Sequence, residues 1–172
     1  FCKVSRCYYY NRLTKTQIID ELYYTPTNEE LKLAVEEWYN YEYYSLEPNP
    51  YPDIYMWNTM LITSIENLFI TMKDFNADIS MWDVSQVTNM RATFYGAHKF
   101  NQDLSGWDTS NVKNMSYMFA QTFVFNQPLK KWNTSNVTDM DYMFYDARKF
   151  NQPLEGLNTS NVICMTGMFK QA

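Results

Sequence analysis

The sequence holds few of the residues on which catalytic and metal sites are usually built. Among 172 residues there is one histidine, His98, and there are three cysteines. Three cysteines make neither a disulfide scaffold nor a zinc site. No Cys-His or Ser-His-Asp set can be assembled around the single histidine. We therefore expect a protein that is not an enzyme, with no catalytic residue, no bound metal and no cofactor.

Positive charge and long apolar runs are also scarce. Lysine and arginine total 14 against 19 acidic residues, the net charge is −5, and the basic residues form no cluster. This balance disfavours nucleic acid as a partner. No run of about 18 apolar residues is present, which predicts that the chain does not span a membrane. No signal peptide is visible, and we expect Cys2 and Cys7 to pair only in a secreted protein, with Cys164 a reduced thiol.

The dominant feature of the sequence is a repeat of 25 residues. FNQDLSGWDTSNVKNMSYMF, residues 100–119, returns as FNQPLKKWNTSNVTDMDYMF, residues 125–144. We call residues 25 positions apart a column. The apolar columns include Trp57, Trp82, Trp107 and Trp132; Ile65, Met90, Met115, Met140 and Met165; and Phe69, Phe94, Phe119, Phe144 and Phe169. A unit of this length cannot bury an apolar face alone, whereas stacked units bury a continuous core.

The first half of each repeat has the spacing of a leucine-rich repeat. Apolar residues stand at Ile79, Trp82, Val84 and Val87, which are offsets 0, 3, 5 and 8 of that pattern. A β-branched residue at the third of these places suits a strand. We therefore expect one short strand per repeat, around residues 82–85, 107–110, 132–135 and 157–160.

The second half of each repeat changes period. Val87, Met90, Phe94 and Ala97 are separated by 3, 4 and 3 residues, which is a helical spacing. We expect one short helix per repeat, on the side away from the strands. The predicted fold is an α/β repeat solenoid, a leucine-rich-repeat-like right-handed coil with one strand and one helix in each repeat and with an N-terminal helical cap.

Recurring asparagines mark the turn that follows. Asn76, Asn101, Asn126 and Asn151 form one column. Stacked amide side chains can bridge backbone groups of successive turns, so we interpret this column as a structural ladder.

The N-terminal quarter differs from the repeats. Thr27 and Glu30 form a predicted capping box, and Leu31, Ala34, Val35 and Trp38 share one face of the helix that follows. A shorter helix is expected at residues 15–24. We assign residues 1–50 to a helical cap with its linker, because a solenoid needs an atypical end unit. Residues 51–172 form about five repeats, the last one incomplete. Some of the many N-terminal tyrosines are expected to cover the first coil. The others either pack in this cap or form a binding surface, and we favour packing in the cap.

The repeats resemble those of the BspA-like surface-protein repeat family, a branch of the leucine-rich-repeat superfamily. FNQDLSGWDTSNVKNMSYMF carries the likeness. TNEELKLAVEEWYN, residues 27–40, is similar to the helix that precedes the first repeat in that family, and YPDIYMWNTMLITSIENLF, residues 51–69, is similar to its degenerate first coil. The resemblance covers roughly residues 27–172. It implies a solenoid, frequent display at the cell surface, and adhesive or protein-binding roles; its members in microbial eukaryotes and large DNA viruses leave the host open.

Two surfaces are candidates for binding a partner. The first is a polar face beside the expected strands, formed by Asp83, Ser85, Asp108, Ser110, Asn133, Ser135, Asn158 and Ser160. This face is either a recognition strip or weak cation site, or a set of turn residues that satisfy their own backbone, and we favour the turn interpretation. The second is the open C-terminal end, where Val162, Met165, Met168 and Phe169 are expected to present an apolar face to water.

The open end has three explanations at this stage. Further repeats, self-association end to end, or a different protein would each cover it. We rank end-to-end stacking, which extends into a filament when it does not close, below the other two.

These features together predict a non-catalytic module that binds a protein partner or serves as a structural part. This prediction takes two forms: a cell-surface or secreted adhesin, and a structural protein of a larger assembly such as a virion. The alternative is a repeat domain that targets a catalytic segment outside this chain.

Overall fold

The N-terminal helix forms where the capping signal predicts it. The computed structural model describes residues 26–172. Helix α3 spans Asn28–Tyr44; the Thr27 hydroxyl accepts from the Glu30 amide, and the Glu30 side chain accepts from the Thr27 amide, so the capping box is complete. Leu31, Val35 and Trp38 are buried on one face, as their spacing predicts. A single turn of 3₁₀ helix, η1, follows at Ile54–Met56.

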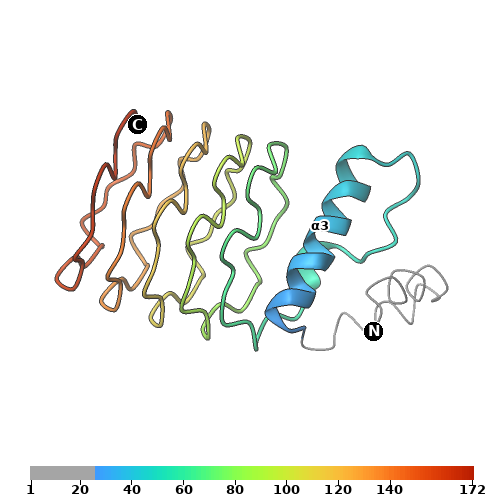
Figure 1. Cartoon of the computed structure of the whole chain (residues 1–172), viewed down its shortest axis with the longest axis horizontal. Coiled ribbons are helices and arrows are strands. Elements are labelled where there is room, and N and C mark those ends of the chain that lie inside the picture. Colours follow the sequence, from blue (N-terminus) through green and yellow to red (C-terminus); the bar gives the residue numbers. More distant parts are fainter. Residues whose placement is uncertain (1–25) are drawn as a thin grey trace.

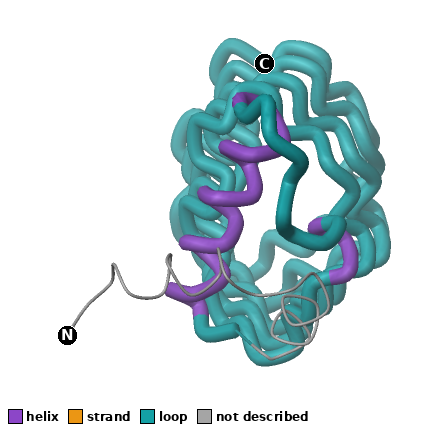
Figure 2. Tube along the Cα trace, turned by 90° about the vertical axis from the view of Figure 1, so that its right-hand side faces the viewer, coloured by secondary structure: helices purple, strands orange, loops and turns teal. Residues whose placement is uncertain are grey.

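The rest of the described chain winds into successive coils that stack along one axis. Figure 1 shows the coils side by side, with α3 beside the first one, and Figure 2 looks along the stack with α3 lying across its near end. We number the coils by residues: coil 1 is 52–76, coil 2 is 77–101, coil 3 is 102–126, coil 4 is 127–151 and coil 5 is 152–172. Coils 1–4 therefore each contain one member of every apolar column, and coil 5 continues the Met90 and Phe94 columns with Met165 and Phe169.

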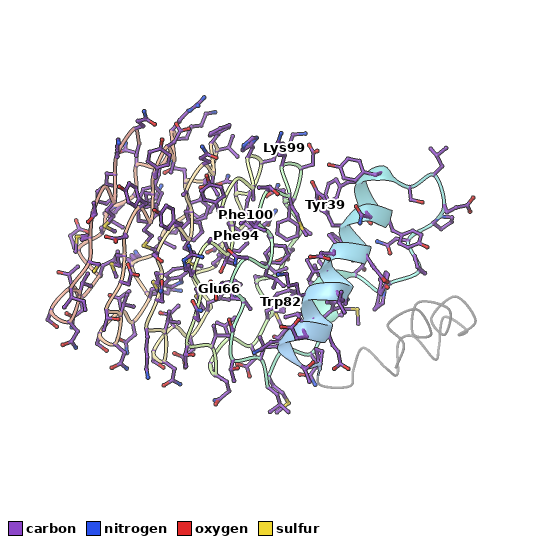
Figure 3. All side chains as sticks on the ribbon, in the orientation of Figure 1. Tyr39, Glu66, Trp82, Phe94, Lys99 and Phe100 are labelled. Atoms are coloured by element: carbon purple, nitrogen blue, oxygen red, sulfur yellow. The ribbon has the colours of Figure 1, made fainter. Side chains whose placement is uncertain are left out.

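Aromatic stacking fills the interior of the coils. Neighbouring members of the Phe94 column lie 5.4–5.7 Å apart between ring centroids and are nearly parallel. The Phe100 column forms a second stack with spacings of 5.7–5.9 Å. Within coil 2 the rings of Phe94 and Phe100 face each other at 3.9 Å, and Figure 3 places both inside the stack. Both are fully buried, so the apolar columns are the core.

The expected strands and helices do not form within the repeats. Among residues 26–172 the only strand-like pairs are isolated parallel bridges one coil apart, namely Ser64–Asn89, Asn89–Asn114, Asn114–Asp139 and Asp139–Cys164. These lie outside the strands predicted at 82–85, 107–110, 132–135 and 157–160. The segments predicted to be helical, such as 87–97, are successions of turns. The secondary-structure part of the prediction was therefore wrong.

Backbone hydrogen bonding between coils explains the missing helices. In coil 2 the amides of Met90, Ala92 and Phe94 donate to carbonyls of coil 3, at 2.8–3.0 Å, and the Gly96 amide does the same at 2.9 Å. A helix would use those amides within the coil. Two residues per coil adopt positive φ, for example Ala92 at 50° and Gly96 at 71°, a conformation that no α-helix accommodates. The turns nevertheless bury Val87, Met90, Phe94 and Ala97, which reproduces the helix-like spacing.

The asparagine ladder forms as predicted. The amides of Asn101, Asn126 and Asn151 each donate to the side-chain oxygen of the asparagine one coil earlier, at 2.8–2.9 Å. Gln102, Gln127 and Gln152 reinforce it, because each side-chain amide donates to the main-chain carbonyl of that same asparagine. The ladder holds the corners of successive coils in register.

Asn126→Ala is expected to lower the free energy of unfolding by about 1 kcal/mol, because the Asn151 amide loses its acceptor. Asn126→Asp keeps an oxygen in that place and is the matched control. Chemical denaturation of both variants measures the difference. Equal losses for the two variants would contradict the ladder's role.

The remaining predictions for the cap fall outside the described residues. These are the helix at 15–24, the pairing of Cys2 with Cys7 and the tyrosines that precede residue 26. Cys164 is a free, exposed thiol.

Candidate functional site

The polar face predicted as one binding surface is a column of turns. The side-chain oxygens of Asp83, Asp108, Asn133 and Asn158 accept from the backbone amides of Ser85, Ser110, Ser135 and Ser160, at 2.9–3.1 Å. The carbonyls of Ser85, Ser110 and Ser135 in turn accept from Asn111, Asn136 and Asn161 of the next coil. The polar groups of this column therefore form hydrogen bonds with local backbone and with the next coil, as the turn interpretation predicts.

The carboxylate within such a turn is held in its charged form. The backbone amide of Ser110, with its hydroxyl, lowers the pKa of Asp108, and Ser80 has the same effect on Asp78. A carboxylate of low pKa is a poor general acid at neutral pH. Among the described residues no cluster of three or more histidine, cysteine or acidic side chains is arranged to hold a metal ion.

His98 belongs to a stacked column on the outside of the coils. Its ring lies on that of Phe123 at 4.2 Å between centroids, and the Arg148 guanidinium lies over Phe123 at 4.1 Å. Partial burial, followed by the positive charges of Lys73 and Arg148, lowers the pKa of His98. The folded protein therefore favours neutral imidazole, which suits a surface packing role.

Stability is expected to fall on acidification through the His98 pKa. Because the folded-state pKa lies below the unfolded value, the unfolded chain takes up the proton first as the pH drops below about 6.5. The contribution of neutral His98 to the free energy of unfolding is complete above that pH and is lost as the pH falls through the lower, folded-state pKa. Thermal melts at about pH 7.5 and about pH 5 should show a larger loss for the parent than for His98→Phe. Equal losses in the two proteins would contradict the assignment.

The second predicted surface, the face of coil 5, is exposed in part. Met165 and Phe169 are 43% and 48% exposed, whereas their equivalents Met140 and Phe144 are fully buried. Val162 is half-buried. Met168 is only 6% exposed and does not belong to the open face, because its side chain lies inside the coil as those of Met118 and Met143 do.

The same face also presents backbone donors. In coil 4 the amides of Met140, Tyr142, Phe144 and Asp146 donate to carbonyls of coil 5, each at 2.9 Å. The equivalent amides of coil 5 belong to Met165, Gly167, Phe169 and Gln171, and within residues 26–172 they meet no acceptor. The face therefore combines apolar rings with a row of hydrogen-bond donors.

The opposite end of the stack is closed by side chains of α3. The oxygen of Asn28 accepts from the amide of Thr63 at 3.0 Å; in coil 2 the equivalent Thr88 amide donates to the carbonyl of Thr63. The hydroxyls of Tyr39 and Tyr43 accept from the amides of Asp74 and Asn76 at 3.2 and 3.3 Å. Figure 3 shows Tyr39 on the side of α3 that faces coil 1. Three side chains thus replace the acceptors of a preceding coil.

Burial keeps these two tyrosines protonated. It is the main cause that raises the pKa of Tyr39 and of Tyr43. The sequence predicts that some of the N-terminal tyrosines cover the first coil, and Tyr39 and Tyr43 do so. Their role as acceptors, and that of Asn28, was not predicted, although the four-residue spacing of Tyr39 and Tyr43 on a helix was a usable signal.

A group of tyrosines on the turn segments that the sequence predicts to be helical was also missed. Tyr117 and Tyr142 stack at 5.0 Å, Tyr95 meets Tyr117 edge-on at 6.3 Å, and Tyr145 meets Tyr142 at 5.9 Å. All four are half-exposed. We call them the tyrosine strip. Tyr117 and Tyr142 have φ of 58° and 53°, where a bulky residue is rare and costs free energy.

A family model matches most of the chain. It is described as "Mycoplasma protein of unknown function, DUF285", and it matches residues 41–135 and again residues 119–172. The chain belongs to this family. The two matches overlap at residues 119–135. No curated protein and no solved structure matches the chain.

Membership in this repeat family assigns no activity. No helix among residues 26–172 is long and apolar enough to cross a membrane.

Proposed function

We propose that this protein is a non-catalytic repeat module that binds a protein partner or forms a structural part of a larger assembly. In this proposal the stack is a leucine-rich-repeat-like solenoid of the BspA-like kind, displayed at a cell surface or on a virion. The observation that supports it most is that the polar columns form hydrogen bonds with backbone of the stack itself. Their asparagine, aspartate and threonine groups hold backbone within the stack, which leaves recognition to residues that differ between coils.

The tyrosine strip is the partner-binding surface that the proposal favours. Its residues do not repeat as a column: the places equivalent to Tyr117 and Tyr142 are Asn67, Ala92 and Gly167. Those smaller residues satisfy the same positive φ, so the coil does not need tyrosine. Tyrosine is enriched at protein interfaces because it offers a large ring with a polar tip. A strained backbone kept at a half-exposed aromatic pair supports a role in recognition.

Immobilised protein tests the proposal against a lysate of its source organism. Three baits are compared: the parent, Tyr117→Ala/Tyr142→Ala, and Asp108→Ala as a variant of the polar face. We expect the parent and Asp108→Ala to retain the same protein and the tyrosine variant to lose it at least tenfold. Retention by all three baits would exclude the tyrosine strip, and no retention above an unrelated bait would contradict the binding function.

A further inference from the structure

The two ends of the stack are complementary to each other. Coil 5 offers amides at Met165, Gly167, Phe169 and Gln171, the same donors that each earlier coil sends forward. Coil 1 carries the matching acceptors on its N-terminal face: the carbonyls of Ser64, Glu66, Leu68 and Ile70 are equivalent to those of Asn89, Arg91, Thr93 and Tyr95, which accept from coil 1 itself. A second copy placed with its coil 1 on coil 5 would therefore continue the same ladder.

The backbone hydrogen bonds that donate toward the preceding coil follow the same register. The amide of Ile163 donates to the carbonyl of Thr138 one coil earlier. The Ile163 carbonyl is the next acceptor in that series, and the Thr63 amide of a second copy is its matching donor. The ring of Phe169 stacks on Phe144 at 5.5 Å through one face, and Phe69 of the second copy would occupy the other face, as Phe94 does for Phe69 within the chain.

Helix α3 occupies the surface on which that second copy would dock. Its Asn28 oxygen already accepts from the Thr63 amide, and Tyr39 and Tyr43 accept from the amides of Asp74 and Asn76. Within residues 26–172, coil 5 of another copy offers the Ile163 carbonyl to the Thr63 amide, whereas α3 supplies acceptors to Thr63, Asp74 and Asn76. The helix also buries Leu31, Val35 and Trp38. It therefore satisfies more of coil 1 than the described part of coil 5 would.

We infer that α3 is a plug that prevents copies of this protein from stacking head to tail, and that its displacement creates a binding face for coil 5 of a second copy. Such an interface is heterologous and does not close, so assembly proceeds to elongated oligomers. This inference is independent of the tyrosine strip and of any partner that binds there.

Substitutions in α3 test the plug within the full chain. Asn28→Ala/Tyr39→Phe/Tyr43→Phe removes the three acceptors and keeps the rings, and Val35→Asp places a charge on the fully buried face of α3. In sedimentation velocity we expect the parent to remain monomeric. Both variants should form elongated oligomers, at concentrations from about tenfold to a hundredfold lower than any at which the parent associates.

Phe169→Asp, added to each α3 variant, identifies the second face. It should restore the monomer, because a charge then lies where Phe69 of the next copy would stack. Folded α3 variants that stay monomeric would overturn the inference, as would association that Phe169→Asp leaves unchanged, or a parent that already forms elongated oligomers. Circular dichroism distinguishes folded variants from unfolded ones.

Hydrogen exchange gives a second measurement on the parent, in case neither α3 variant folds. The amides of Thr63, Asp74 and Asn76 should exchange together through release of α3. Their exchange should be slower than that of the coil 5 amides of Met165, Gly167, Phe169 and Gln171. Exchange of these three amides only by global unfolding would overturn the inference, because α3 would then never leave coil 1 alone.

Discussion

Phe119→Ala should lower the free energy of unfolding by about 3–5 kcal/mol, the usual cost of deleting a large buried ring. Phe119 is fully buried and stacks between Phe94 and Phe144, at 5.6 and 5.7 Å, with Phe125 against it at 4.1 Å. Its removal leaves a cavity in the middle of the stack. Trp107→Ala should cost a similar amount, and it also removes the indole hydrogen bond to the Ile79 carbonyl.

Phe123→Ala is the matched control for this measurement. Phe123 lies four residues further on, is half-exposed, and contacts His98 and Arg148 on the outside. We expect a loss of about 1 kcal/mol, because that ring is not enclosed. Chemical denaturation compares the two variants, and a Phe119→Ala loss no larger than that of Phe123→Ala would contradict the assigned core.

Deletion of residues 1–46 should convert the protein into an aggregating species. The deletion removes α3, so the amides of Thr63, Asp74 and Asn76 lose their acceptors. It also uncovers the apolar end of coil 1 around Trp57, Ile62 and Phe69, which are buried in the intact chain. Exposed apolar patches of more than a few hundred Å² promote association. Light scattering and a dye that binds apolar surface measure the effect.

Deletion of residues 1–25 alone is the control, because it keeps α3 and its contacts with coil 1. We expect this shorter deletion to remain soluble and dye-negative. A soluble, folded and dye-negative protein without residues 1–46 would remove the cap assignment for α3.

The buried columns were predictable because burial depends only on spacing. Residues such as Phe94 and Met115 recur every 25 positions, and a stack offers such residues one environment, the interior. The asparagine ladder was predictable for the same reason, since Asn101 recurs at a turn where backbone amides need acceptors. Helix α3 was predictable from Thr27 and Glu30, whose side chains satisfy the first amides of the helix.

The shape of the coil itself was not predictable from the same spacing. The steps from Val87 to Ala97 fit an α-helix and fit a series of tight turns equally well. Positive φ at Ala92 distinguishes the two, and alanine gives no local signal of that conformation. The acceptors on Asn28 and Tyr43 were missed because their partners lie 35 and 33 residues away, and no repeat relates helix to coil.

The forward-donating amides give the stack an electrical direction. Every coil sends its row of N–H groups toward the next one, so these peptide dipoles add along the axis instead of cancelling as they do between antiparallel strands. The coil 5 face therefore carries partial positive charge at its amides. Asp141, whose carboxylate accepts from the Thr166 amide at 2.5 Å, lies beside that end with its negative charge. These forward-pointing amide dipoles run from α3 toward coil 5, although the coils contain no α-helix.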